Sequence, residues 1–186
     1  MPKDALRALP DASLRPPAVE VRAMRAAKIL LLAALAFFYS LVVFNNLFDF
    51  ESNYQFVRHV LLMDSTFPGN HGMGRALHAP GVHLAFYLGI IAWEIAMAAL
   101  SWWGAANLLR ARRGTAAEFA AARTVPVVAL TLSLLLWLVA FLAIGGEWFL
   151  MWQSREWNGQ DAAFRNFAIA GVVLLILLQP EGGDRL

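Results

Sequence analysis

The sequence predicts an all-α protein, a four-helix transmembrane bundle with a short amphipathic helix in the first outer loop. Composition is the first indication, because 60% of the 186 residues are apolar and only 15% are charged. Soluble domains average about 45–50% apolar and about 25% charged residues. Four apolar segments also reach the ~17–25 residues that a helix needs to cross a bilayer. Finally, Lys and Arg gather in alternate connections between these segments.

The chain divides into a tail and one domain. Residues 1–23 hold four of the eight prolines, several basic residues and no apolar period, so we expect a disordered basic N-terminal tail. Residues 24–186 are predicted to form a single four-helix membrane domain. Its first span, 29–48, is longer than the ~7–15 residues of a secretory signal core and lacks a small-residue cleavage site. We therefore expect it to stay in the mature protein.

The connection 49–81 contains the predicted amphipathic helix. Ser52 and Gln55 have the spacing of a capping box, which would start a helix there. Four apolar residues then recur on one helical face: Phe56, Val57, Val60 and Leu61. Such a face favours a helix lying on the membrane surface. We expect Pro68-Gly69-Asn70 to end it.

Three more spans follow, at about 82–109, 125–144 and 162–178. Trp102 and Trp103 lie where a membrane interface is expected near the end of the second span. We predict that residues 110–123 form a loop between the second and third spans. Gly145-Gly146 is predicted to end the third span.

The distribution of positive charge predicts the orientation. Four spans place the tail, the 110–123 loop and the C-terminus on one side, and these segments hold eleven of the fifteen Lys and Arg residues. The positive-inside rule then puts both termini in the cytoplasm. We therefore predict a multi-pass protein of the bacterial inner membrane, with the loops 49–81 and 145–165 on the outer face.

Glu94 is the candidate for an intramembrane function. It falls near the middle of the second span, where an ionised carboxylate costs at least ~2.5 kcal/mol. The group must therefore be protonated, be paired or face an internal cavity. Two interpretations stay open. Glu94 is either a proton or cation relay or ligand anchor, or a neutral acid hydrogen-bonded to a neighbouring helix.

The two outer loops supply a candidate binding patch. Its members in the second loop are Glu147, Trp148, Trp152, Gln153, Arg155, Trp157, Asn158 and Gln160. Its members in the first loop are Asn53, Gln55, His59 and Asp64. Aromatic side chains give a recognition surface its contact area, and amides give it orientation. The alternative is an aromatic belt at the membrane interface, where Trp is enriched in any case.

Motifs for catalysis and for cofactors are lacking. Without cysteine the chain has no disulfide, thiolate metal site, Cys nucleophile or covalent haem attachment. His59, Asp64, His71, His78 and His83 raise the question of a metal, but their spacings match no metal motif, and no P-loop, dinucleotide motif or nucleophile elbow occurs. We predict no catalytic residue, no metal site and no cofactor, and we lean against an enzyme. Haem, quinone and metal binding remain alternatives.

Two stretches resemble a known family. The first runs from Asn53-Tyr54-Gln55-Phe56-Val57 through His59-Val60 to Met63-Asp64-Ser65-Thr66-Phe67, and the second from Gly146-Glu147-Trp148-Phe149 through Met151-Trp152-Gln153-Ser154 to Trp157-Asn158-Gly159-Gln160 and Phe164-Arg165. Both are similar to a bacterial family of predicted small integral membrane proteins, the domain-of-unknown-function family 2165. The resemblance covers about residues 24–178. It implies four spans and no particular activity.

Three functions follow as hypotheses. The leading one is a non-catalytic accessory, anchoring or assembly subunit that docks a partner on its outer face. That partner would be a membrane protein, a periplasmic protein or a second copy of the chain. The alternative is a transporter or sensor of a small solute, proton or cation that uses Glu94. A third is a redox membrane subunit binding haem or quinone. Membrane lipids are expected partners, and nucleic acid is not.

Overall fold

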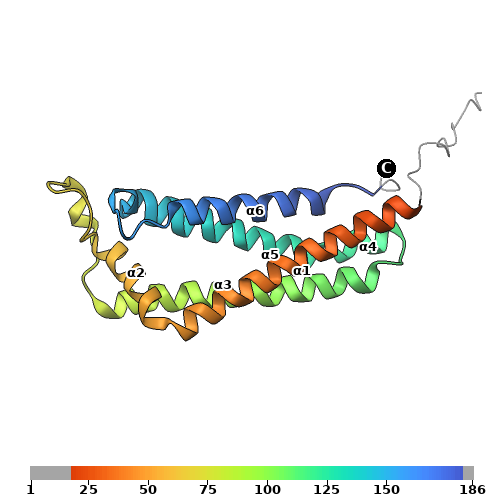
Figure 1. The fold of residues 1–186 in the computed structure, drawn as a ribbon, viewed down its shortest axis with the longest axis horizontal. Helices are drawn as coiled ribbons and strands as arrows, with labels where there is room; N and C mark the ends of the chain where they lie inside the picture. Colours follow the sequence, from red (N-terminus) through yellow and green to blue (C-terminus); the bar gives the residue numbers. More distant parts are fainter. Residues whose placement is uncertain (1–17, 182–186) are drawn as a thin grey trace, which may run out of the picture.

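The computed structural model describes residues 18–181, in which four long helices lie side by side (Figure 1). They are α1 (Ala18–Phe48), α3 (Pro80–Ala111), α5 (Thr124–Leu135) with its continuation η3 (Leu136–Trp148), and α6 (Gln160–Leu178). The shorter elements are α2 (Phe50–Leu62), η2 (His71–Arg75), α4 (Ala116–Ala122) and η4 (Met151–Gln153). Four helical segments are long and apolar enough to cross a membrane. The predicted all-α class with four spans is confirmed.

The long helices bury a narrow apolar stripe and leave most of their apolar surface outward. On α1 the stripe consists of Leu32, Leu35, Ala36 and Tyr39. Small residues let the helices approach closely. This is expected in a membrane, where van der Waals packing between helices, and not the hydrophobic effect, drives their association. At Gly104 of α3, an added Cβ would lie only 2.8 Å from the ring of Pro126 in α5. Only glycine fits this crossing.

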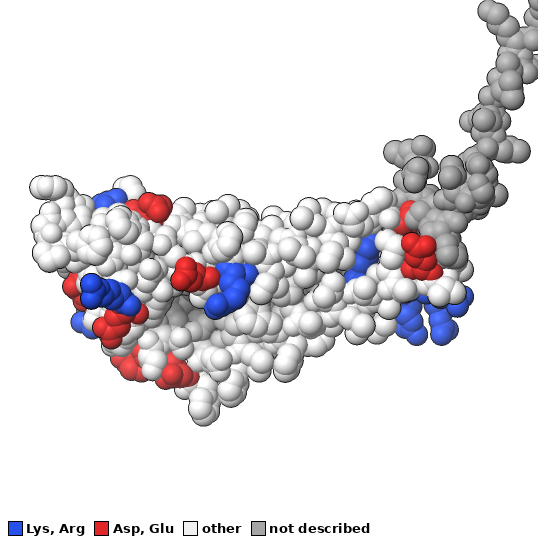
Figure 2. Space-filling view, turned by 45° about the horizontal axis from the view of Figure 1, so that its top comes forward, with Lys and Arg blue, Asp and Glu red and all other residues white. Residues whose placement is uncertain are grey.

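The bundle has two different ends (Figure 1). The start of α1, the α3–α4 loop and the end of α6 lie together at what we call the termini end. Residues 49–79 and 147–159 lie at the other end, which we call the cap. On the face drawn in Figure 2, charged side chains gather towards the two ends and leave a largely uncharged band between them. Such a band is what a helix bundle presents to lipid.

The amphipathic helix is present as α2, but its ends differ from those predicted. It starts at Phe50, so Ser52 lies inside the helix and makes no capping box. It ends at Leu62, because Met63 adopts a left-handed backbone with φ of 55°. Val57 and Leu61 are buried, with α2 packed on α3, so this apolar face covers protein instead of resting on the membrane alone.

Part of the segment predicted as a loop between the second and third spans is helical. Thr115 accepts a hydrogen bond from the Glu118 backbone through its Oγ1, and Glu118 Oε2 accepts one from the Thr115 N–H. This reciprocal capping box starts α4. The spacing Thr-x-x-Glu at residues 115–118 is the sequence signal for this helix start.

The third span also continues beyond its predicted end. The chain continues as a π-helix, η3, as far as Trp148. At its end the Phe149 N–H bonds to the carbonyl of Ile144, five residues earlier. The predicted helix stop, Gly145-Gly146, is buried inside η3. An added Cβ on Gly146 would collide with the amide of Gln160, so this glycine permits close packing of the following chain rather than ending the helix.

The first helix starts earlier than predicted. Helix α1 begins at Ala18, six residues before the expected domain boundary, and residues 1–17 and 182–186 lie outside the described part of the chain. Residues 18–23 have no proline, and Glu20 lies in the first turn, where its charge favours the helix dipole. Residues 18–23 are therefore part of α1.

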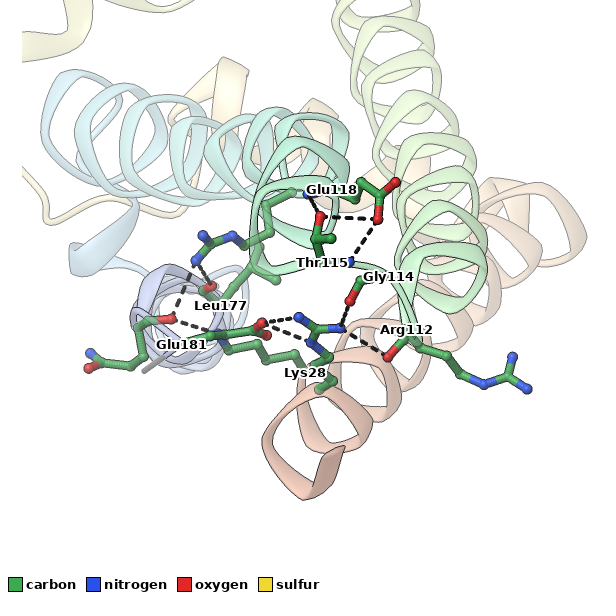
Figure 3. Close-up of polar contacts among 10 residues, drawn as sticks. Lys28, Arg112, Gly114, Thr115, Glu118, Leu177 and Glu181 are labelled. Atoms are coloured by element: carbon green, nitrogen blue, oxygen red, sulfur yellow. Dashed lines mark hydrogen bonds and ion pairs between the residues drawn. The ribbon is translucent and has the colours of Figure 1, made fainter. Parts of the chain in front are cut away.

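Arg25 is the centre of a buried polar cluster at the termini end. Figure 3 labels three of its partners, Glu181, Arg112 and Gly114. Its Nη2 lies 2.6 Å from Oε2 of Glu181, which is also buried. Its Nη1 donates to the backbone carbonyls of Arg112, at 3.1 Å, and Gly114, at 2.7 Å. The guanidinium also lies over the ring of Phe119, 4.6 Å from its centroid. One side chain of α1 thus holds the α3–α4 loop, α4 and the chain after α6.

Two further cations in this cluster donate hydrogen bonds to backbone carbonyls at the end of α6. Lys28 Nζ donates to the carbonyl of Gln179 at 2.6 Å. Arg123 Nη1 donates to the carbonyls of Leu177 and Gln179, both at 3.3 Å. The last carbonyls of a helix have no partner within it and carry partial negative charge, so cations are favourable there. The cluster therefore fastens α6 to α1 and to the start of α5.

We expect Arg25→Met to lower the free energy of unfolding by about 3–5 kcal/mol, because it leaves Glu181 buried without its guanidinium. Unfolding in detergent, followed by circular dichroism, would measure this loss. Arg22→Ala, at an exposed position one turn away, is the control and should change the value by less than ~0.5 kcal/mol. The double variant Arg25→Met/Glu181→Leu should recover part of the loss. Equal stability of Arg25→Met and wild type would contradict the assigned role.

Candidate functional site

The cap is held together by side chains from both of its loops. His59 of α2 lies between them: its Nδ1 is 2.7 Å from Oδ2 of Asp64, and its ring stacks on Trp157 with centroids 4.6 Å apart. The edge of Phe56 also meets the ring of Trp157. His59, Asp64 and Trp157, which the sequence placed in one binding patch, are therefore close together. They join the loops of the cap to each other.

Ser154 is the buried hub of the second loop. Its Oγ accepts hydrogen bonds from the backbone N–H groups of Trp157, at 2.8 Å, and Glu156, at 3.3 Å. It also accepts one from the hydroxyl of Ser65 in the first loop, at 2.9 Å. Beside it, the Gln153 side chain accepts a hydrogen bond from the Phe67 N–H at 3.0 Å. These bonds fix the shape of the loop and its place against residues 63–67.

Aromatic side chains remain exposed on the surface of this cap. Trp148 is 56% exposed, Trp152 is 45% exposed, and Phe67, which contacts Trp152, is 54% exposed. Trp152 meets the ring of Phe67 edge-on, and the guanidinium of Arg75 lies 5.4 Å from the ring centre of Trp148. We call Trp148, Trp152, Phe67 and Arg75 the aromatic surface of the cap. Two of its members, Phe67 and Arg75, were missed in the sequence because their contacts are tertiary.

The other residues predicted for the patch have mixed positions. Glu147, Arg155 and Asn158 are exposed on the cap, as a binding surface requires. Asn53 instead donates to the backbone carbonyls of Asp49 and Asn45 where α1 turns into α2. Gln55 bonds to Glu51 and Arg58 on its own helix, and Gln160 packs against Gly146. These three amides support the cap and do not face a common site with the tryptophans.

An apolar cavity of about 80 Å³ lies under the cap, between α2, α3 and η3. Its walls include Phe56, Val60, Phe86, Phe141, Ile144 and Met151. Helix α2 therefore covers the gap between α3 and η3 without filling it.

Glu94 is buried at 3% exposure and accepts a hydrogen bond of 2.6 Å from the side chain of Asn46. The hydroxyl of Tyr87 donates to the backbone carbonyl of Asn46 at 2.8 Å, so Asn46 joins both residues of α3 to α1. The sequence offered a signal for this partner, since Asn45-Asn46 interrupts an otherwise apolar run.

Glu94 lies level with the last turn of α1. Its partner Asn46 lies two residues before the end of α1 and eighteen residues after Lys28, which is roughly 27 Å along a helix. The hydrocarbon core of a bilayer is about 30 Å thick. Along α1, Glu94 therefore lies about the thickness of a bilayer core away from Lys28, and on its own helix it lies close to the middle of α3. The α3 residues Tyr87 and Ile91, just before it, pack against α2.

The histidines do not converge. Within residues 18–181, no group of three or more His, Cys, Asp and Glu side chains is close enough to hold a metal ion. His83 is buried, and its Nε2 bonds to the carbonyl of Leu77 at 2.7 Å, which fastens the loop before α3.

Fold and cap together define a class, the small helical integral membrane proteins with four spans. The chain belongs to the predicted small integral membrane protein family DUF2165, whose profile matches residues 24–180. This match confirms the resemblance noted in the sequence. No curated protein and no solved structure shows a significant match to the chain.

We expect Ser154→Ala to loosen the second loop of the cap, because the N–H groups of Glu156 and Trp157 lose their acceptor. Buried donors without a partner cost about 1–3 kcal/mol. Amide hydrogen exchange at residues 154–157 should therefore quicken by on the order of tenfold. Ser52→Ala, at an exposed position on α2, is the matched control and should leave the exchange unchanged. Protection of residues 154–157 that survives Ser154→Ala would refute the hub role.

Proposed function

We propose that the protein is a non-catalytic accessory, anchoring or assembly subunit that docks a partner protein on its cap. The observation that carries this proposal is the aromatic surface of the cap. Trp148 and Trp152 stay about half exposed. Gln153, Ser154 and Trp157 fix the loop that carries Trp152, and Trp148 is the last residue of η3. A surface fixed before binding loses little conformational freedom on association.

The chemistry of this surface suits protein recognition. Trp and Arg are the residues that most often dominate the binding energy of protein interfaces. Arg75 lies on Trp148, and the exposed charges of Glu147 and Arg155 are close along the chain. This combination supplies aromatic contact area with a charged rim. We infer a partner that offers an apolar pocket bordered by polar groups, either a membrane protein or a protein outside the membrane.

We further propose that the protein resides in the bacterial inner membrane, with the termini end in the cytoplasm and the cap outside. The support is the charge asymmetry. The segments that meet at the termini end carry Arg22, Arg25, Lys28, Arg110, Arg112, Arg113 and Arg123, whereas the cap and the start of α6 carry Arg58, Arg75, Arg155 and Arg165. Positively charged segments are retained in the cytoplasm during insertion.

Glu94 supports a second candidate function, transport or sensing of a proton, cation or small solute. It is a buried carboxyl group within a helix long and apolar enough to span the membrane, and such groups often mark ion pathways. Its hydrogen bond to Asn46 and the link to Tyr87 equally suit a structural connection between α1 and α3. Docking is preferred because the exposed surface it needs is already formed.

We expect Trp148→Ala/Trp152→Ala to reduce recovery of the partner by about tenfold or more, because each tryptophan removes a large contact. Chemical cross-linking in cells, mild extraction and quantitative mass spectrometry would measure this. Phe37→Ala/Trp103→Ala is the matched control, since it also removes two exposed aromatics, but from the membrane spans. Equal losses in both pairs, or in neither, would argue against docking on the cap.

Glu94→Gln separates the two candidate functions. The glutamine keeps the size of the side chain and can still accept from Asn46, so a docking subunit should recover its partner at the wild-type level. If Glu94→Gln abolishes the cellular function while the fold and partner recovery are normal, transport or sensing through Glu94 becomes the better assignment.

The absence of cysteine makes the orientation directly testable with single-cysteine variants. Glu156→Cys, exposed on the cap, should react in intact cells with a maleimide that cannot cross the inner membrane. Ala117→Cys, exposed on α4, should react only after permeabilisation. The opposite labelling pattern would reverse the proposed orientation.

A further inference from the structure

A groove of about 820 Å³ opens at the termini end, between the first turns of α1 and the loop after α3. The charged residues of its wall are Arg22 and Arg25 from α1 and Arg112 and Arg113 from the loop. Apolar side chains of α1, including Val21, Ala26 and Ile29, form the rest of its α1 side. None of the described residues that line it is acidic.

Three of these four arginines have charges that no acid neutralises within residues 18–181. Arg25 is paired with Glu181. Arg112 points away from that pair in Figure 3 and makes one hydrogen bond, to the carbonyl of Leu109. Arg22 and Arg113 are exposed, and neither forms an ion pair or hydrogen bond with the described part of the chain. The groove therefore has a local excess of positive charge.

Arg25 also gives the groove a fixed shape. Its guanidinium donates to the backbone carbonyls of Arg112 and Gly114, so the basic loop is tied to α1 through its main chain (Figure 3). The side chains of Arg112 and Arg113 are left out of this connection. The loop thus presents two guanidinium groups beside Arg22 without having to fold when a ligand arrives.

The groove lies at the depth of lipid headgroups. Arg22 precedes Lys28 by six residues, which is roughly 9 Å along α1 beyond the last charged residue before the apolar span. The polar headgroup layer extends about 5–7 Å beyond the hydrocarbon core on each side of a bilayer. The backbone of Arg22 therefore lies just outside this layer, and its long side chain can reach back into it. Ala26 lies within this layer and Ile29 on its membrane side, where the glycerol and the first carbons of a lipid would pass.

We propose that this groove binds a phosphate group, and that the phosphate belongs to the headgroup of an anionic phospholipid. Guanidinium groups bind phosphate oxygens through paired, charge-assisted hydrogen bonds. A free phosphate ion would use the same arginines. The apolar side of the groove and its depth favour a ligand that also has a hydrocarbon part.

Native mass spectrometry of the whole protein, released from detergent with added lipid, tests the proposal. Phosphatidylglycerol should bind at least about tenfold more tightly than zwitterionic phosphatidylcholine, because charges near the bilayer surface favour anionic lipid. Arg22→Gln/Arg113→Gln should lose most of this preference. Arg155→Gln/Arg165→Gln removes two exposed arginines from the other end of the bundle and should keep the preference for phosphatidylglycerol.

Each contrary outcome decides against the proposal. Equal binding of the two lipids, or an unchanged preference in Arg22→Gln/Arg113→Gln, would overturn the site. Displacement of phosphatidylglycerol by millimolar inorganic phosphate, but not by chloride at the same ionic strength, would reassign it to free phosphate. Arg22→Lys/Arg113→Lys is a further control. It keeps both positive charges and should retain most of the phosphatidylglycerol binding. A loss in this variant equal to that in the Gln pair would mean that the charge is not what binds the lipid.

Discussion

The buried guanidinium of Arg25 is the interaction on which the arrangement of this bundle most depends. A charged side chain is expensive to bury, and it persists only where partners satisfy it from several directions. Here Glu181, two backbone carbonyls and the Phe119 ring surround it, and they come from segments far apart in the sequence. Between helices whose apolar surfaces would pack equally well on lipid, such directional contacts select one arrangement.

Helix α1 connects both ends of the molecule. Near its start, Arg25 and Lys28 hold the α3–α4 loop and the end of α6. Near its other end, Asn46 joins Glu94 and Tyr87 of α3. In between, Tyr39 bonds to Ser133 of α5 at 2.6 Å. A single helix thus makes a polar contact with its neighbours at each level of the bundle, and each contact fixes a register that apolar packing alone would leave free to slide.

The cap divides its polar and aromatic residues between two tasks. One group makes hydrogen bonds and ring stacking contacts that hold the two loops of the cap together: His59, Gln153, Ser154 and Trp157. Trp148 and Trp152 keep about half of their surface exposed. Sequence alone could not separate these groups, because stacking of Trp157 on His59 depends on how two loops, almost a hundred residues apart, meet in space.

The sequence by itself determined the class, the four spans and the grouping of the loops, because lipid imposes length and polarity on every crossing segment. It also singled out Glu94 and the two exposed tryptophans of the cap, Trp148 and Trp152. Tertiary structure decided the rest. It joined Glu94 to Asn46 of α1, carried the third helix through Gly145-Gly146, and made Arg25 a structural residue rather than only an orientation signal. These outcomes depend on which side chains meet across helices, and no local pattern of residues encodes that.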